Sequence, residues 1–112
     1  MVASKHKLKN LKIIIDYNKI QALSKLKDAL PLNNLLSKIK SFNCNCFNVK
    51  DGHSFKSIIS VLKKKNNSFK PKVIILNTIK GKGIKEFEND PVWHARKIEK
   101  KDIEIGLKRL NS

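Results

Sequence analysis

Apolar residues gather in three short runs that are separated by longer amphipathic stretches. The runs cover residues 11–17, 45–50 and 72–78, and turn-forming residues such as Asn10, Asn18 and Asp51 bound the first two. Compact apolar runs of this length predict strands, and the first and third are apolar enough for strands covered on both faces of a sheet. The pattern therefore predicts three short strands spread along the chain.

Helical spacing follows the first two of these runs and returns at the end of the chain. Residues 31–42 place apolar side chains on one stripe, with Pro31 suited to the first turn of a helix. Ser54 is a suitable cap for a second helix, which would end in the lysine run 63–65. Residues 100–110 predict a short C-terminal amphipathic helix. The apolar stripe of the first helix comprises Leu32, Leu35, Leu36, Ile39 and Phe42; the second helix would carry Phe55, Ile58, Ile59 and Leu62 inward; and the third repeats Ile103, Leu107 and Leu110.

The order strand, helix, strand, helix, strand is typical of a parallel α/β sheet with right-handed crossovers. The chain has 112 residues, which suits a single small domain with a modest core. It contains no run of about 18 apolar residues and no apolar segment at its start that would suit a signal peptide. We therefore expect a cytoplasmic protein without a membrane partner.

Two cysteines, Cys44 and Cys46, lie two positions apart in the segment NCNCF, where the second predicted strand begins. That spacing puts both side chains on the same face, where an ordinary disulfide does not form. No second cysteine pair completes a zinc site. We expect buried free thiols, which suit a reducing compartment.

The formal net charge of +16 raises nucleic acid as a partner. Of the 25 basic residues, however, only Arg96 and Arg109 are arginine, the residue that favours bidentate phosphate and guanine contacts. Lysine, asparagine and isoleucine all have codons rich in A and T, so biased composition is a sufficient explanation of the charge. No specific nucleic-acid partner is expected.

Candidate chemistry lies after the first and third strands, because ligands of parallel sheets sit beyond the carboxyl ends of the strands. Asp16, Asn18 and the backbone carbonyls around Lys19 and Ile20 offer oxygen ligands suited to Mg²⁺. Gly81 and Gly83 allow close approach of a backbone to a phosphate. The alternatives remain an Asx turn at Asn18 and an ordinary tight turn at the glycines.

The chain from residue 8 to about residue 110 resembles the later part of the thiamine-diphosphate-binding domain of transketolases, especially the separately encoded N-terminal subunits of bacteria. The resemblance is carried by HKLKNLKIIIDYNKIQ, KDALPLNNLLSKIKSFNCNCFNVKDGHSF, KPKVIILNTIKGKG and FENDPVWHARK. Lys-Gly-Lys-Gly followed by Glu-Asn and then Trp-His is a specific combination. The resemblance implies a partial thiamine-diphosphate-binding fold of about three parallel strands with crossover helices and a C-terminal helix, forming a single partial domain over residues 1–112.

Three site residues follow from this resemblance. Asn18 matches the asparagine that ligates the divalent cation, and Ile20 matches the residue that offers a backbone carbonyl to it. His94 matches a histidine that reaches the cofactor and substrate; its alternative is a histidine packed under Trp93. His53 lies in an Asp-Gly-His turn and is not expected to be a site.

The sequence also departs from the family pattern. The Gly-Asp-Gly that opens the family's metal motif is absent, and with it one aspartate ligand of the cation. Ser24 stands where the family commonly has glycine, which would strain the loop if positive φ is needed. The glutamate that engages the cofactor's aminopyrimidine lies in a separate pyrimidine-binding domain. The resemblance therefore implies a homo- or hetero-oligomer that includes a transketolase C-terminal (pyrimidine-domain) subunit.

Three classes of function follow. The first is a fragment or subunit of a transketolase that acts with thiamine diphosphate and Mg²⁺ on sugar phosphates and is inactive alone. The second is a nonenzymatic assembly or binding module with a remnant fold. The third is a lysine-driven nucleic-acid binder, for which no motif or set of stacking aromatics is present. An uncovered sheet edge and apolar patch are expected wherever the rest of such a domain would pack.

Overall fold

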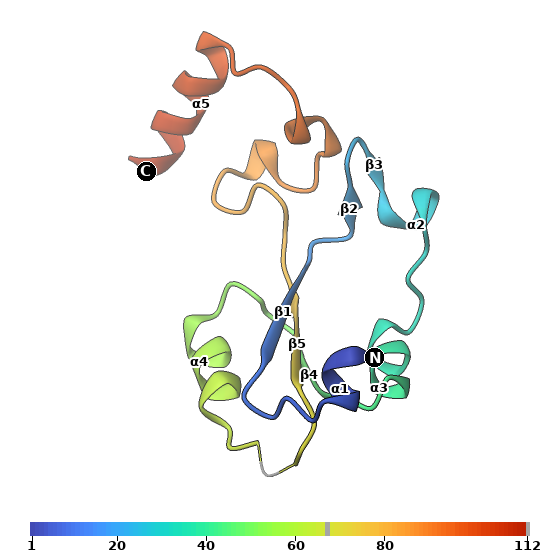
Figure 1. Cartoon of the computed structure of the whole chain (residues 1–112). Helices are drawn as coiled ribbons and strands as arrows, with labels where there is room; N and C mark the ends of the chain where they lie inside the picture. The colour runs from blue at the N-terminus through green and yellow to red at the C-terminus, as the bar shows by residue number, and fades with distance from the viewer. Residues whose placement is uncertain (67, 112) are drawn as a thin grey trace. The chain divides into compact units, whose positions relative to one another are not determined.

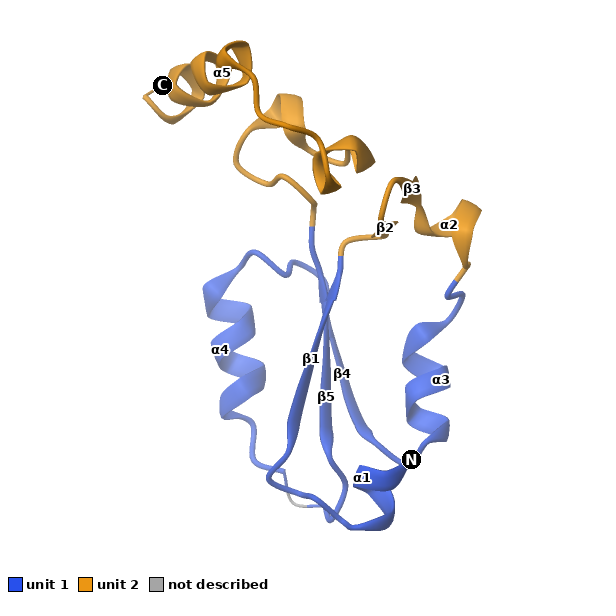
Figure 2. Ribbon diagram, turned by 45° about the horizontal axis from the view of Figure 1, so that its top comes forward, with its two compact units in different colours: residues 1–17, 32–78 blue, residues 18–31, 79–112 orange. Residues whose placement is uncertain are grey.

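A computed structural model of the chain describes residues 1–66 and 68–111. These residues form two compact units (Figures 1 and 2). Unit 1 comprises Met1–Tyr17 and Leu32–Thr78, and unit 2 comprises Asn18–Pro31 and Ile79–Ser112. Each is described by itself.

Unit 1 is built on a parallel sheet of three strands, as the sequence predicts. The strands are β1 (Lys12–Tyr17), β4 (Asn45–Val49) and β5 (Lys72–Asn77). Their order is β1-β5-β4, so the strand that comes last in the sequence lies in the centre. Ile74 of β5 is paired with Ile14 on one side and with Phe47 on the other.

Three helices accompany this sheet: α1 (Val2–Lys5), α3 (Leu35–Ser41) and α4 (Phe55–Lys63). Figure 2 shows α3 and α4 on opposite faces of the sheet. The cap predicted for α4 is confirmed, because the Ser57 N–H donates to Ser54 Oγ at 3.2 Å. The predicted start of α3 at Pro31 is wrong. Asn34 adopts a left-handed conformation with φ 55°, so the helix begins only at Leu35.

The core of unit 1 is centred on β5. Val73, Ile74 and Ile75 are buried, as predicted for a strand covered on both faces. The same prediction is wrong for β1, where Ile13 and Ile14 are 37% and 52% exposed. β1 is an edge strand, and a continuous apolar run does not distinguish an edge position from a central one.

The helices leave several predicted core positions uncovered. On α4, Ile58 and Leu62 are half-buried, whereas Phe55 is 81% exposed and Ile59 is also exposed. Phe42, which follows α3, is exposed as well. One side of α4 is therefore partly covered, whereas Phe55 and Ile59 of the predicted stripe are open to solvent.

Lys72, the first residue of β5, is buried to 1% exposure. Its ammonium group donates to the carbonyl oxygens of Val61 at 3.2 Å and Lys64 at 2.5 Å, and it lies 5.4 Å from the centre of the Phe47 ring. Burial, reinforced by nearby lysines, lowers the pKa of Lys72 below its ordinary value. The buried cation thus satisfies carbonyl groups at the C-terminal end of α4, where a helix leaves them unpaired.

Unit 2 contains short elements joined by turns. Its N-terminal part holds β2 (Ile20–Gln21), β3 (Ser24–Lys25) and α2 (Leu26–Ala29), with β2 and β3 paired as an antiparallel hairpin. Its C-terminal part holds two 3-10 helices, η1 (Lys85–Phe87) and η2 (Pro91–His94), followed by α5 (Lys100–Leu110).

Two sequence predictions concern residues of unit 2. Positive φ occurs at Lys19 and Ala22 and not at Ser24, which lies in β3, so the strain considered for Ser24 does not arise. The C-terminal helix is confirmed over the predicted range. Its apolar stripe is uncovered: Ile103, Leu107 and Leu110 are all more than half exposed.

Both cysteines are free, as predicted, but they are half-buried and not fully buried. Cys44 precedes β4, and its sulfur lies 3.5 Å from Ser4 Oγ. Burial, with the neighbouring Cys44 in second place, raises the pKa of the Cys46 thiol. Along residues 1–66 and 68–111, no helix has the length and apolar character needed to cross a membrane.

Candidate functional site

Asn18 and Ile20 form an Asx turn at the start of unit 2. Asn18 Oδ1 accepts a hydrogen bond from the Ile20 N–H at 2.9 Å. Lys19, between them, has φ 63°, which lets the chain fold back over so short a distance. The Asx turn at Asn18, which the sequence left open as an alternative to a metal ligand, is therefore present. It leaves Asn18 Oδ1 with a second lone pair for another partner.

The Ile20 carbonyl lies on the same edge as the Asn18 side chain. The Leu26 N–H donates to Lys19 O at 2.8 Å, while Ile20 is paired with Lys25 across the hairpin. Hydrogen-bonding positions alternate along an antiparallel ladder, so the N–H and C=O of Ile20 both point away from β3. The N–H meets Asn18 Oδ1, and the carbonyl beside it faces the same side.

These two groups fit part of a magnesium site. An amide oxygen and a backbone carbonyl are hard ligands, and Mg²⁺ commonly takes few protein ligands while keeping waters or phosphate oxygens. Within the part of the chain that the structure describes, no cluster of three or more His, Cys, Asp or Glu residues could hold a metal ion by itself. The donor set thus suits a cation that other groups also bind.

The glycine turn after β5 is a closed loop. Gly81 and Gly83 have φ 74° and 114°, values that favour glycine, and the Asn89 N–H donates to Lys80 O at 2.9 Å. A side chain at Gly81 would collide with the carbonyl of Phe87. The glycines are therefore required by the turn itself.

His94 is the last residue of η2 and is exposed to solvent. The helix is capped by Asp90, whose Oδ1 accepts from the Val92 N–H at 3.0 Å. The neighbouring Trp93 lies against Phe87, with ring centres 4.1 Å apart, and under Arg96 at 4.5 Å. Trp93 thus anchors the segment while His94 remains accessible, which differs from the alternative of a histidine packed under the tryptophan.

A second anchor for this segment was not foreseen from the sequence. Arg96 Nη2 binds both carboxylate oxygens of Asp102, at 2.6 and 2.5 Å, and Asp102 is 5% exposed. Asp102 Oδ2 also accepts from the Glu99 N–H at 2.9 Å, which caps α5. This backbone hydrogen bond, followed by the bond from Arg96, lowers the pKa of Asp102 despite its burial. The sequence signal that could have predicted the cap of α5 is Asp102, an acidic residue three positions after the cap residue Glu99.

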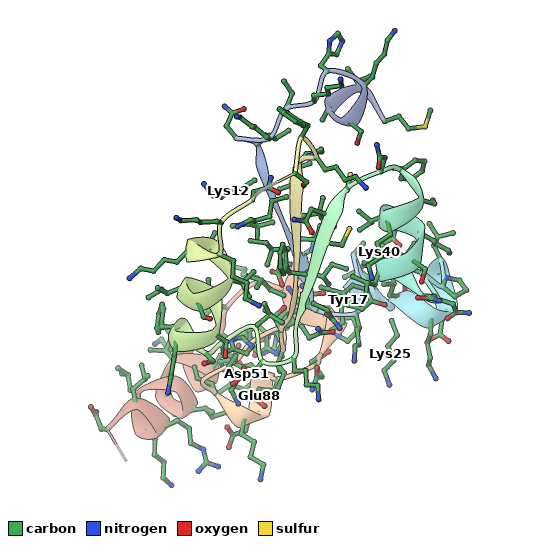
Figure 3. All side chains as sticks on the ribbon, turned by 90° about the horizontal axis from the view of Figure 1, so that it is seen from below. Lys12, Tyr17, Lys25, Lys40, Asp51 and Glu88 are labelled. Carbon is green, nitrogen blue, oxygen red and sulfur yellow. The ribbon has the colours of Figure 1, made fainter. Side chains whose placement is uncertain are left out.

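The carboxyl end of the sheet in unit 1 carries a separate polar cluster. A surface cavity of about 390 Å³ is lined there by residues that include Tyr17, Asn48 and Asn77. Asn77 Nδ2 donates to Asn48 Oδ1 at 2.7 Å and to Val49 O at 2.8 Å. The ends of all three strands therefore contribute polar groups to this edge, and Figure 3 labels Tyr17 at the end of β1.

The Asp-Gly-His segment closes the loop after β4. Asp51 Oδ1 accepts from the His53 N–H at 2.9 Å, and the Gly52 N–H donates to Asn77 O at 2.7 Å. At the same edge, Thr78 Oγ1 donates to the Asp16 carboxylate. These contacts give Asp51 and Gly52 a role in the turn.

A parallel α/β sheet with polar groups beyond its carboxyl ends defines a cofactor-binding class of domain. Residues 1–111 match the family described as transketolase, thiamine diphosphate binding domain. The chain belongs to this family.

Two curated relatives are subunits of bacterial transketolases. The chain is 34% identical over 110 residues to one subunit of the apulose-4-phosphate transketolase of Actinobacillus succinogenes, covering 98% of this chain and 40% of that protein. It is 34% identical over 99 residues to the SqwG subunit of the 6-deoxy-6-sulfo-D-fructose transketolase of a Clostridium species, covering 88% of this chain and 36% of that protein. The chain thus spans about two fifths of the length of these relatives.

A solved transketolase shares the fold. The crystal structure of transketolase from Campylobacter jejuni superimposes with a TM-score of 0.85 at 24% identity, covering 98% of this chain and 17% of that one. The partial thiamine-diphosphate-binding fold predicted from the sequence is confirmed.

Proposed function

We propose that the chain contributes to a transketolase site that transfers a two-carbon ketol unit between sugar phosphates. The observation that carries this proposal is that Asn18 Oδ1 and the Ile20 carbonyl lie on the same side of β2, in a chain that belongs to the thiamine-diphosphate-binding family. Asn18 and Ile20 would bind Mg²⁺ through these oxygens. The cation would in turn bind the diphosphate of the cofactor.

Thiamine diphosphate, when bound, supplies the carbon nucleophile that accepts the ketol unit. The role proposed for this chain is to hold and orient. His94 extends from a short helix fixed by Trp93 and by the pair Arg96 and Asp102, so its imidazole is held at the surface on a rigid segment. A histidine in that position can donate a hydrogen bond to a substrate hydroxyl or take its proton.

The proposed site needs groups beyond these three residues. An aspartate and the glycines of a Gly-Asp-Gly segment would complete the cation and diphosphate contacts, and a pyrimidine-domain subunit would supply the glutamate that engages the cofactor. Both bacterial relatives are named as single subunits of their transketolases, which supports a partner subunit for this chain. We therefore propose a hetero-oligomer in the cytoplasm as the active form.

The isolated chain should be inactive and should bind cofactor poorly. One amide oxygen, one carbonyl and one histidine cannot replace the missing carboxylates and phosphate contacts. Isothermal titration with thiamine diphosphate at millimolar Mg²⁺ tests this expectation, and micromolar affinity of the isolated chain would contradict it.

Reconstitution provides the direct test of the proposed roles. The chain is combined with a segment containing Gly-Asp-Gly and its following helix and with a pyrimidine-domain subunit, and ketol transfer between sugar phosphates is measured. Asn18→Ala should raise the Mg²⁺ concentration required for half activity roughly 10-fold or more, because it removes a direct ligand. His94→Ala should lower turnover roughly 100-fold while cofactor affinity changes little.

Two exposed residues away from the proposed site serve as matched controls. Asn111→Ala and His6→Ala remove the same side chains at exposed positions and should leave both quantities unchanged. If Asn18→Ala and His94→Ala behaved like these controls in an active assembly, the proposed roles of both residues would be wrong although the family assignment would stand.

A further inference from the structure

Both arginines of this lysine-rich chain bind carboxylates, and both bonds join α5 to the preceding segment of residues 79–99, which carries His94 and is called the His94 segment below. Arg96, just after η2, binds both carboxylate oxygens of Asp102 on α5 at 2.6 and 2.5 Å. Arg109 lies on α5, and its Nε donates to Glu86 Oε1 in η1 at 2.8 Å. Of the 25 basic residues, the only two arginines are thus used at the contact between the His94 segment and α5.

The face of α5 that meets the His94 segment is polar. Asp102, Gly106 and Arg109 follow one another at helical spacing of four and three positions, so they lie on one side of the helix. Asp102 and Gly106 are buried. A Cβ built at Gly106 would lie 3.4 Å from Ile84 Cδ1, in the residue that precedes η1. α5 therefore meets the segment at three successive positions of this face.

Aromatic contacts close these bonds into a ring of contacts around η2. Phe87 of η1 lies against Trp93 with ring centres 4.1 Å apart, and the guanidinium of Arg96 lies 4.5 Å from the centre of the Trp93 ring. The contacts thus run from Arg109 through η1 to Trp93, and from Trp93 through Arg96 back to Asp102. Because this ring begins and ends on α5, it ties η2 to the helix from two directions.

Arginine suits the place of Arg96 better than lysine does. A planar guanidinium can lie over an indole ring while its N–H groups still bind a carboxylate, whereas a lysine ammonium is a point charge without a stacking plane. Asp102 is only 5% exposed, so its carboxylate depends on the groups that bind it within the fold. Arg96 is therefore the link through which α5 acts on Trp93.

We propose that Arg96 is a positioning residue that acts through His94. By joining Trp93 to Asp102, it holds η2 and keeps the His94 imidazole in the orientation that the substrate requires. This inference rests on the catalytic role proposed above for His94. It adds α5 to the parts of the chain that the reaction needs, because α5 carries the carboxylate that holds Arg96.

The isolated chain tests the positioning without any catalysis. In the wild type, the ¹H–¹⁵N heteronuclear NOEs of residues 93–95 should match those of α5, and in Arg96→Leu they should fall to values typical of a mobile loop. Asp102→Asn should change them in the same direction. That variant keeps an oxygen that can accept from the Glu99 N–H and removes only the charge that binds Arg96. Trp93 is the only tryptophan of the chain, so acrylamide quenching of its fluorescence should rise in both variants.

Turnover in the reconstituted assembly tests whether Arg96 acts through His94. Arg96→Leu should lower kcat roughly 10-fold with little change in KM or in cofactor affinity, because a small misplacement of a catalytic group slows the reacting step. Arg96→Lys should recover part of this loss, since it restores one charged contact to Asp102. In a His94→Ala background, Arg96→Leu should cause no further loss of kcat.

Lys97→Leu is the matched control. Lys97 is the neighbouring basic residue and is exposed, so its replacement should leave both the NOEs and kcat unchanged. Far-UV circular dichroism checks that each variant is folded. If Arg96→Leu does not fold, Arg96→Lys and Asp102→Asn make the same comparisons, each with a smaller expected loss.

Three results would overturn the proposal. Unchanged NOEs in folded Arg96→Leu would show that Arg96 does not hold the His94 segment. A loss of kcat that is as large in the His94→Ala background as in the wild type would show that Arg96 acts on the substrate or on the fold. Normal turnover of Arg96→Leu in an assembly where His94→Ala is slow would reject the positioning role.

A different result would identify a failure of the proposed function itself. If His94→Ala left turnover unchanged, the catalytic role of His94 would be wrong. The NOE comparison would then still decide whether Arg96 orders this segment.

Discussion

Replacing Gly52 by alanine is predicted to destabilise unit 1 strongly, although the glycine does not have a positive φ. A Cβ built at Gly52 would lie 2.6 Å from Thr78 Cγ2 and 2.8 Å from the Asn77 carbonyl oxygen. The second of these atoms belongs to the backbone at the end of the central strand, so it cannot move without disturbing β5. The loop after β4 must shift instead.

The magnitude follows from the two contacts that such a shift affects. Relieving the overlap costs about 1–3 kcal/mol, as for other overpacked sites. The shift also lengthens the 2.7 Å hydrogen bond from the Gly52 N–H to Asn77 O, which is worth about 1 kcal/mol. A total loss of about 2–4 kcal/mol is a large share of the stability of a small domain and corresponds to a drop in Tm of at least about 10 °C.

Urea unfolding followed by circular dichroism measures this loss, with Gly106→Ala as the matched control. Gly106 is also buried, but it lies within α5, and an added Cβ would meet only the tip of the Ile84 side chain at 3.4 Å. That variant should be neutral or gain up to about 1 kcal/mol, since alanine is the better helix former. If Gly52→Ala unfolded at the same urea concentration as the wild type, the close approach to β5 would not constrain this loop.

Four further predictions concern charged groups. Because the pKa of Asp102 is lowered in the folded chain, its carboxylate adds stability above the ordinary carboxyl pKa. That stability is lost as the pH falls through the pKa of Asp102 in the folded chain. Acid titration should therefore destabilise the wild type more steeply than Asp102→Asn. Lys72→Met should destabilise the chain by about 1–3 kcal/mol at pH 7 in urea unfolding, because the α4 carbonyl groups lose a buried donor; equal stability would show that water replaces the ammonium group. For Lys72 itself, a pKa below that of the unfolded chain means that the stability of the wild type relative to Lys72→Met should rise as the pH rises towards 10.5. Binding to duplex DNA should be independent of sequence and should fall steeply with salt in a filter-binding or anisotropy assay, whereas a sequence preference at physiological salt would contradict the compositional explanation of the lysines.

The α/β class, the three strands and the C-terminal helix could all be predicted from local patterns. Which strand is central could not, because β1 and β5 are similar apolar runs and their order depends on pairing between distant parts of the chain. Local patterns also could not predict that the apolar stripe of α5 is exposed. Periodicity identifies the apolar side of a helix, but it does not show that another element covers that side.

The candidate site was predictable only in part. Asn18, Ile20 and His94 were proposed from the resemblance to transketolases, and their roles remain predictions. The structure adds that the Asn18 and Ile20 oxygens lie on the same side of β2 and that His94 is exposed. The bond between Arg96 and Asp102 was missed because an acidic residue three positions after the helix cap predicts the cap of α5 but does not show that Arg96 pairs with it.

The central position of β5 has a consequence for how the chain folds during synthesis. Lys12 of β1 pairs with Lys72, sixty residues later, and neither outer strand pairs with the other. A nascent chain that ends before residue 72 therefore carries two apolar strands that have no partner in unit 1. The sheet can form only after β5 has left the ribosome, so its folding is expected to be slow and to occur late in translation. Until then the two unpaired strands are exposed to aggregation and to capture by chaperones.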